Sequence, residues 1–149
     1  MGKINTQRVV IGGLLAGLII NISEFILNMM VIGEDMNAAM ARLNLPPVGG
    51  NAIIVFVAFG FIVGILTVWL YAAIRPRFGA GPKTALIAAA FVWFMAYFYG
   101  SIGMGVMGIF PSQLLAIGMV WGLVELLIAG VAGAYLYQES TPTGRAAAV

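Results

Sequence analysis

The chain contains neither cysteine nor histidine, and only 8% of its 149 residues are charged. These absences remove the usual ligands of haem, structural zinc, iron–sulfur clusters and copper, and they also remove disulfide bonds and catalysis by cysteine or histidine. The seven basic residues include no dense run, so nucleic-acid binding is unsupported. We therefore expect that the protein is not an enzyme, and that it has no catalytic residue, no cofactor and no metal site.

Long apolar stretches dominate the rest of the sequence. Hydrophobic residues make up 62% of the chain and the mean hydropathy is +1.07, which is typical of an integral membrane protein. A bilayer core about 30 Å thick requires about 20 apolar residues per spanning helix. Stretches at residues 9–32, 52–74, 84–109 and 114–137 predict four such helices. We expect one all-α domain over residues 1–149, folded as an antiparallel four-helix bundle.

The connections between these stretches differ in length. The outer loop, residues 33–51, is the longest, and its Pro46-Pro47 and Gly49-Gly50 pairs disfavour a continuous helix. This loop forms either a mobile segment or a short amphipathic helix on the membrane surface, because four of its apolar residues recur at helical spacing. These four are Met36, Ala39, Met40 and Leu43.

Local signals also indicate where the other helices end. Arg75-Pro76-Arg77 is expected to end the second helix, and Gly81-Pro82 to begin the third. The polar tail at residues 138–149 lacks apolar periodicity and is expected to be a loose terminus.

The basic residues predict the orientation of the four helices. Only Arg42 lies in the outer loop, and the other six basic residues fall on the opposite side of a four-span chain. Cytoplasmic loops carry an excess of lysine and arginine, so both termini are expected in the cytoplasm. The six are Lys3, Arg8, Arg75, Arg77, Lys83 and Arg145.

Two glutamates lie far inside the apolar stretches. An ionised carboxylate at the centre of a bilayer costs about 3 kcal/mol on insertion scales, so Glu24 and Glu125 each need a partner, a proton or a water-lined cavity. At 1.5 Å per residue, Glu24 lies about 12 Å and Glu125 about 16 Å from the outer end of its helix. The two carboxyls are therefore expected at similar depths.

Small and polar residues accompany each glutamate on one helix face. Gly13 and Gly17 precede Glu24, and Gly118 and Gly122 precede Glu125. Two antiparallel helices with Gly-x-x-x-Gly faces can approach closely, so the two carboxyls are expected to meet and share a proton. The candidate ion or proton site consists of Glu24, Glu125, Asn21 and Asn28. The alternative is that these groups only form interhelical hydrogen bonds, each worth about 0.6–2 kcal/mol.

The third stretch carries a dense aromatic cluster followed by glycines. One of its faces is expected to line a pocket beside the carboxyls, as a site for a cation over aromatic rings. Packing against lipid or a neighbouring subunit is the alternative. The candidate pocket wall consists of Trp93, Tyr97, Ser101 and Trp121. In the second stretch, Gly60-x-x-x-Gly64 loosely matches Gly130-x-x-Gly133 of the fourth, a weak sign of duplicated hairpins.

Two segments, Asn21–Asn28 (NISEFILN) and Arg75–Lys83 (RPRFGAGPK), carry a resemblance. At these segments the chain resembles uncharacterised small bacterial four-span membrane proteins. The resemblance extends over nearly the whole length of the chain. The resemblance implies a bacterial inner (cytoplasmic) membrane and no catalytic residue. The chain differs from small multidrug transporters, because it has a second glutamate in its fourth helix and a longer outer loop.

Two functional classes follow from these observations. The first is a structural or accessory subunit of a larger membrane assembly, whose glycine-rich and aromatic faces contact lipid, pigments or other membrane-protein subunits. The second is a small proton- or cation-coupled carrier or channel that uses Glu24 and Glu125, and that works as a homo-oligomer because four helices enclose little space. The missing histidine and cysteine favour the first class, and the two intramembrane acids favour the second. We expect the first class, an accessory subunit, with the carrier or channel as the alternative.

Overall fold

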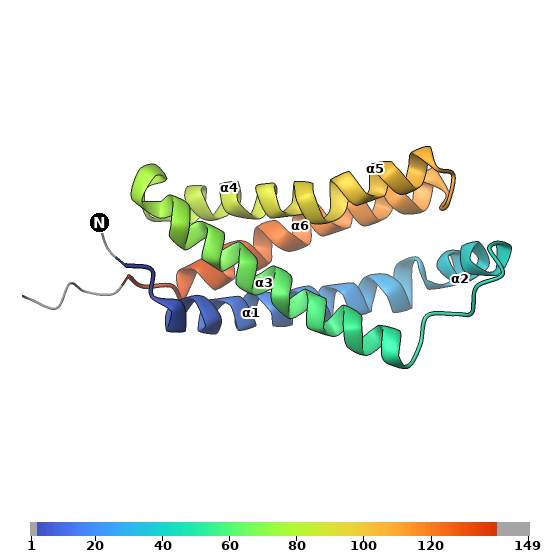
Figure 1. Cartoon of the computed structure of the whole chain (residues 1–149), viewed down its shortest axis with the longest axis horizontal. Helices are drawn as coiled ribbons and strands as arrows, with labels where there is room; N and C mark the ends of the chain where they lie inside the picture. Colours follow the sequence, from blue (N-terminus) through green and yellow to red (C-terminus); the bar gives the residue numbers. More distant parts are fainter. Residues whose placement is uncertain (1–2, 140–149) are drawn as a thin grey trace, which may run out of the picture.

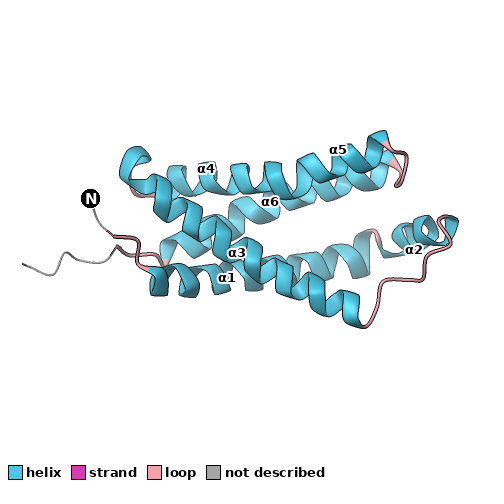
Figure 2. Ribbon diagram, in the orientation of Figure 1, coloured by secondary structure: helices cyan, strands magenta, loops and turns pink. Residues whose placement is uncertain are grey.

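The computed structural model describes residues 3–139, which fold into six α-helices and two short π-helical segments without any strand (Figures 1 and 2). Four continuous helical stretches are long and apolar enough to cross a membrane: Thr6–Val31, Asn51–Phe78, Pro82–Val106 and Ser112–Tyr135. The prediction of four spanning helices is confirmed, and the chain is a multi-pass membrane protein. From residue 140 onward, the tail that was expected to be loose lies outside the described residues.

The first span changes from α-helix to π-helix before it ends. Helix α1 (Thr6–Ile26) continues into the π-helix η1 (Leu27–Val31), and α2 (Gly33–Arg42) follows after Ile32. The Ile32 N–H donates to the Leu27 carbonyl at 3.0 Å, which closes the wider turn. Helix α2 decides the open question about the outer loop in favour of a short helix. Its Ala39 is buried and packs with Leu27, Ile32 and Leu114.

The second span runs further than the sequence indicated. Helix α3 (Asn51–Phe78) includes Pro76, so Arg75-Pro76-Arg77 lies inside the helix and the expected end at this tripeptide is wrong. Proline removes one backbone donor and its ring crowds the carbonyl four residues earlier, yet α3 continues for two more residues to Phe78. The chain then turns through Gly79 and Gly81. Their φ angles are 86° and 128°, values that would strain any residue that carries a side chain. Pro82 begins the next helix.

The third span is interrupted in its middle, whereas the fourth is regular. Helix α4 (Pro82–Trp93) passes through the π-helix η2 (Phe94–Phe98) into α5 (Tyr99–Val106), and α6 (Ser112–Tyr135) forms the fourth span. Helix α1 packs on both α3 and α6, and α4 also packs on both α3 and α6. The start of α1, the α3–α4 turn and the end of α6 lie at one end of the molecule, and α2 and the α5–α6 connection lie at the other (Figure 1).

Glycines allow the backbone of α1 to lie against α3. A Cβ atom added at Gly64 would lie 2.5 Å from the Gly13 carbonyl oxygen and would overlap the Gly17 nitrogen. The stripe of Gly13 and Gly17 therefore packs on α3, and the expectation that this stripe packs on the fourth helix is wrong. The close approach of α1 to α6 occurs one residue away, between Gly12 and Gly133.

The fourth-helix glycines also differ from the expectation. Gly118 has no atom within 4 Å of an added Cβ, and Gly122 faces the ring of Tyr97. Neither residue contacts α1 in the way that the sequence suggested, because α6 turns its later glycines, Gly130 and Gly133, toward the other helices.

The crossing of α1 and α3 yields a test of stability. We expect Gly64→Ala to destabilise the protein by about 1–3 kcal/mol, because the added methyl group would meet backbone atoms that cannot move aside. Gly103→Ala in α5 is the matched control, since an added Cβ there meets nothing within 4 Å. Unfolding of both variants in detergent, followed by circular dichroism, measures the difference. Equal stability of the two variants would contradict the close crossing.

Candidate intramembrane carboxyl site

One tyrosine hydroxyl connects the two glutamates inside the membrane-spanning region. The Tyr97 hydroxyl lies 3.1 Å from Glu24 Oε1 and 2.9 Å from Glu125 Oε1. Glu24 is on α1, Tyr97 is on η2 and Glu125 is on α6, so three of the four spans contribute to the site. The expectation that the two glutamates approach each other inside the protein is confirmed. Their hydrogen bonds pass through Tyr97, a residue that the sequence placed in the pocket wall.

The position of Tyr97 depends on two local features. It lies in the π-helical turn of η2, where the extra residue in the turn rotates the side chains relative to a regular α-helix. On the facing helix, Gly122 leaves room for the ring, because an added Cβ would lie 2.5 Å from Tyr97 Cδ1. The missing side chain at position 122 is what allows the phenol to lie between the two carboxyls.

A second π-helical segment adds an amide to the site. Asn28 lies in η1 and donates from Nδ2 to Glu24 Oε2 at 3.0 Å and to the Glu24 backbone carbonyl at 2.8 Å. Both oxygens of the Glu24 carboxyl are therefore hydrogen-bonded, one to Tyr97 and one to Asn28. π-Helical turns occur frequently at functional sites, and here both of them carry a residue that contacts Glu24.

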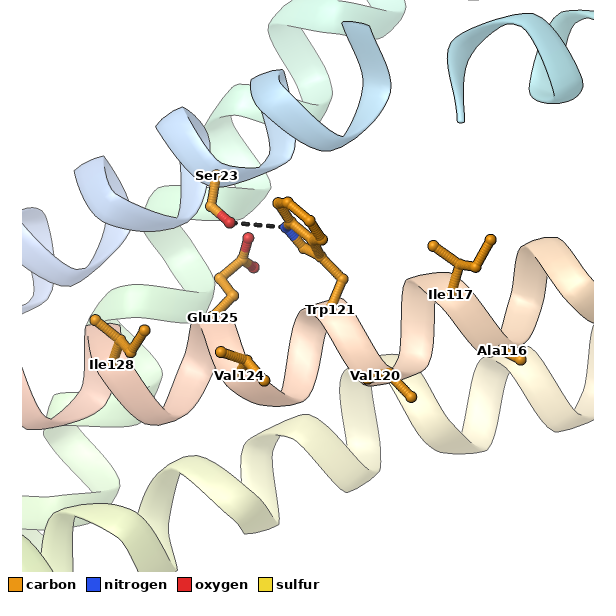
Figure 3. A pocket seen from close by; sticks show the side chains of 8 residues that line it. All are labelled: Ser23, Ala116, Ile117, Val120, Trp121, Val124, Glu125 and Ile128. Atoms are coloured by element: carbon orange, nitrogen blue, oxygen red, sulfur yellow. Dashed lines mark hydrogen bonds between the residues drawn. The ribbon is translucent and has the colours of Figure 1, made fainter. Parts of the chain in front are cut away.

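Glu125 is the more buried of the two acids and the less satisfied. Its side chain is 3% exposed, whereas Glu24 is partly exposed. The Ser23 hydroxyl lies beside the Glu125 carboxyl and interacts with it (Figure 3). However, Ser23 Oγ accepts the Trp121 indole N–H at 2.9 Å. Within residues 3–139, Glu125 Oε2 has no partner with hydrogen-bond geometry.

The geometry constrains how many protons the site holds. A phenol has a single proton to donate, yet two carboxyl oxygens lie within reach of the Tyr97 oxygen. If both carboxyls were ionised, one of them would face the phenol oxygen with no proton between them. If one carboxyl is protonated, it donates to the phenol oxygen and the phenol donates to the other carboxyl. The two hydrogen bonds of the Tyr97 hydroxyl can therefore form together once at least one of the two acids is protonated.

Within residues 3–139, neither Glu24 nor Glu125 forms an ion pair with a basic side chain. In the described part of the chain, the ion pair that forms is between Arg75 and Glu139, at 3.8 Å. Residues 3–139 also contain no cluster of three or more aspartate, glutamate, histidine or cysteine side chains that could hold a metal ion. A proton or a bound cation therefore has to balance any charge on Glu24 and Glu125.

Asn21 lies apart from this network, although the sequence placed it in the same candidate site. Its Nδ2 donates to the Gly17 carbonyl at 2.8 Å and to the Val57 carbonyl of α3 at 3.2 Å. The amide also covers Gly60, where an added Cβ would lie 2.7 Å from Asn21 Nδ2. Asn21 therefore stabilises the α1–α3 contact, which matches the alternative of interhelical hydrogen bonding for this residue.

Two cavities lie beside the carboxyls. The smaller, about 220 Å³, is lined by Glu24, Asn28, Tyr97 and Ser101 and by apolar residues of α2 and α6. The larger, about 620 Å³, is an open groove lined by Ser23, Trp121, Glu125 and five apolar residues of α6 (Figure 3). The groove residues of α6 besides Trp121 and Glu125 are Ala116, Ile117, Val120, Val124 and Ile128.

The predicted pocket wall is therefore divided. Tyr97 and Ser101 line the smaller cavity and Trp121 lines the groove, whereas Trp93 lines neither. The Trp93 indole N–H instead donates to the Met119 carbonyl of α6 at 2.8 Å. The π-helical turn causes this division, because it breaks the regular spacing on which a single wall of Trp93, Tyr97 and Ser101 was based.

Ser23 is the site residue that the sequence analysis missed. The sequence feature that could have indicated Ser23 is its hydroxyl, which directly precedes Glu24 in the middle of an apolar span. Neighbouring residues on a helix are separated by about 100°, so Ser23 does not share the helix face on which the candidate site was based. No known protein family, no curated protein and no solved structure matches the chain. The chemistry of the site therefore follows from its own geometry.

A pair of glycine variants tests how Tyr97 is positioned. We expect Gly122→Ala to displace the Tyr97 ring and to change the infrared carbonyl band of the protonated carboxyl, because the added methyl group would occupy space that the ring fills. Gly118→Ala, one helical turn earlier, adds the same group where nothing lies within 4 Å and should leave the band unchanged. An unchanged band in Gly122→Ala would contradict this role of Gly122.

Proposed function

We propose that the protein is a small proton- or cation-coupled carrier whose exchange site consists of Glu24, Tyr97 and Glu125. The observation that supports this function is the single hydroxyl within hydrogen-bond distance of two intramembrane carboxyls. A carboxyl in the membrane interior is stable when it is protonated or when it is paired with a cation. One site can then hold either of two ligands, a proton or a cation, and this alternative occupancy is the basis of coupled exchange.

The exchange step involves one O–H bond. In the proton-loaded state, one carboxyl keeps its proton and donates it to the Tyr97 oxygen, while the Tyr97 proton is donated to the other carboxyl. When a cation binds, the O–H bond of the protonated carboxyl breaks, the proton leaves to water and the cation balances the new carboxylate. The smaller cavity supplies a polar route to Glu24, because Asn28 and Ser101 are among its lining residues.

The state of Glu125 is the reason that we favour a carrier over the accessory role that the sequence favoured. Burying a polar group without a hydrogen bond costs about 1–3 kcal/mol on protein mutational scales, and Glu125 Oε2 is such a group. A subunit that only fills space would be more stable with an apolar residue or an amide at this position. A carrier needs a group that changes its proton occupancy.

An accessory subunit is the second candidate, and one feature of α3 favours it. Residues 51–59, the first third of α3, are exposed on every face of the helix. A helix whose residues are exposed along this length offers a surface for another membrane protein. Purification from the native membrane in mild detergent separates the two functions. An accessory subunit should copurify with a stoichiometric partner, and a carrier should be isolated alone or as copies of itself.

A bacterial inner membrane and cytoplasmic termini complete the proposal, on the basis of the charge distribution and the resemblance described above. We expect Asn37→Cys in α2 to react with a membrane-impermeant thiol reagent in intact cells and Ala80→Cys to remain unlabelled. Both side chains are exposed, and the chain has no cysteine of its own. Position 80 is preferred to the neighbouring Gly79, whose φ of 86° would strain a side chain. Labelling at position 80 alone would invert the orientation.

The carrier function is tested in proteoliposomes with an acidic interior and a trapped pH dye. Potassium, sodium and a series of organic ammonium ions are added outside in turn. We expect at least one of them to drive proton efflux through the wild-type protein. Glu24→Gln and Glu125→Gln should each abolish this efflux, because glutamine keeps the shape of the side chain and cannot ionise.

Glu34→Gln is the matched control, since Glu34 is exposed on α2. It should preserve the efflux, and all three variants should keep wild-type helicity. Two outcomes would contradict the carrier function: no cation drives efflux through the wild type, or the efflux persists in both Glu24→Gln and Glu125→Gln.

A further inference from the structure

We propose that the groove between α1 and α6 binds a hydrophobic organic cation that enters from the lipid, with Glu125 as its counter-ion. This inference rests on the proposed function and names the substrate class of that site. Apart from Ser23 of α1, all the residues that line the groove are on α6 (Figure 3). Its volume, about 620 Å³, lies within the range of about 300–1,000 Å³ that is usual for sites of small organic ligands.

The outer edge of the groove faces the region that lipid occupies around a membrane-spanning helix. Val120, Val124 and Ile128 line the groove and have exposed fractions of 66%, 53% and 59%. α6 is one of the four membrane-length helices, so these side chains lie at the depth of the hydrocarbon core. A ligand that reaches the groove along this edge must be soluble in lipid, and hence largely apolar.

The charge in the groove selects a cation. Glu125 is the ionisable residue among those that line it, and the lining contains no lysine or arginine. Its Oε2 is buried and has no hydrogen-bond partner in residues 3–139. Trp121 lies beside the carboxyl in Figure 3, and an indole face attracts cations. An anion would meet only repulsion from an ionised Glu125.

The scarcity of oxygen atoms makes this groove a poor site for calcium or magnesium. Calcium takes six to eight oxygen ligands and magnesium requires an octahedral shell. The groove offers only the Glu125 carboxyl and the Ser23 hydroxyl, and the hydroxyl oxygen already accepts the Trp121 N–H. A cation whose charge is surrounded by its own carbon atoms needs no such shell, so a quaternary ammonium or phosphonium is the chemistry that fits.

Protons should compete with this ligand at Glu125. The groups that face the carboxyl are Tyr97 from η2, Ser23 from α1 and, through Tyr97, Glu24 from α1. None of these groups carries a positive charge, so acid acts by placing a proton on a carboxyl of the network. A protonated Glu125 has no charge to offer. Binding should therefore weaken as the pH falls, by up to about tenfold for each pH unit once the carboxyl is protonated.

The test is equilibrium binding of tetraphenylphosphonium to the purified protein in lipid nanodiscs, measured by calorimetry. Tetraphenylborate, which has nearly the same size and the opposite charge, is the control ligand. We expect saturable binding of the phosphonium, weaker binding in acid and no saturable binding of the borate. Glu125→Gln should abolish the phosphonium binding. Glu34→Gln should preserve it, because Glu34 is exposed on α2 away from the groove lining.

A second pair of variants tests the location. Val120→Trp should fill the groove and block phosphonium binding, whereas Val106→Trp should leave it intact. Val106 is 84% exposed on α5 and lines neither the groove nor the smaller cavity. Three results would each overturn the inference. The first is equal binding of phosphonium and borate, and the second is an equal effect of the two tryptophan substitutions. A third is a protein that is dimeric, binds no phosphonium and becomes monomeric with Val120→Trp, since the groove would then be an interface between copies.

The outcome is distinguishable from that of the carrier proposal. If ammonium ions or metal cations drive proton efflux and the phosphonium does not bind, the groove inference fails and the carrier function stands. If the phosphonium binds in a Glu125-dependent manner and no cation drives proton efflux, the groove is a cation site and the carrier function fails.

Discussion

The position of the carboxyl site depends on how closely the backbone of α1 approaches two other helices. Gly13 and Gly17 place α1 directly against α3, and Gly12 places it against Gly133 of α6. Neighbouring glycines on one helix thus contact two different partners. With this end of α1 fixed between α3 and α6, the chain continues toward Glu24 beside α6. Side chains at any of these glycines would separate the helices and move Glu24 away from Glu125.

Tyr97 serves as the polar connection where the helices no longer touch through backbone atoms. Glu24 and Glu125 come from different helices, and the phenol fills the distance between them without adding a charge. A lysine or arginine in its place would form a fixed ion pair and would leave no exchangeable proton. The neutral phenol contacts both acids without supplying a charge, so a proton on one of the carboxyls completes the two hydrogen bonds.

The sequence predicted the coarse features well because they depend on composition and length alone. The four spans, the short helix with Ala39 and the proximity of Glu24 to Glu125 followed from apolar runs, helical spacing and matched depth. Helix partners depend on three-dimensional packing, and identical Gly-x-x-x-Gly patterns on several helices gave no basis for choosing α3 over α6. The π-helical turns carry no sequence signal of their own, so the separation of Trp93 from Tyr97 was not predictable.

The two ends of the molecule are held together by different contacts. At the end with the termini, the Tyr137 hydroxyl accepts the Asn5 N–H at 3.3 Å, and the Tyr137 ring packs edge-on against Tyr71 at 5.9 Å and lies 5.5 Å from the Arg75 guanidinium. At the other end, α3 diverges from α5 and α6 (Figure 1), whereas Ala39 of α2 packs with Leu114 of α6. The π-helix η1 follows Glu24 toward this end, whereas η2 contains Tyr97 itself. If either turn changed from π-helical to α-helical hydrogen bonding, Asn28 or Tyr97 would move relative to the carboxyls. The aromatic contacts would hold the opposite end in place.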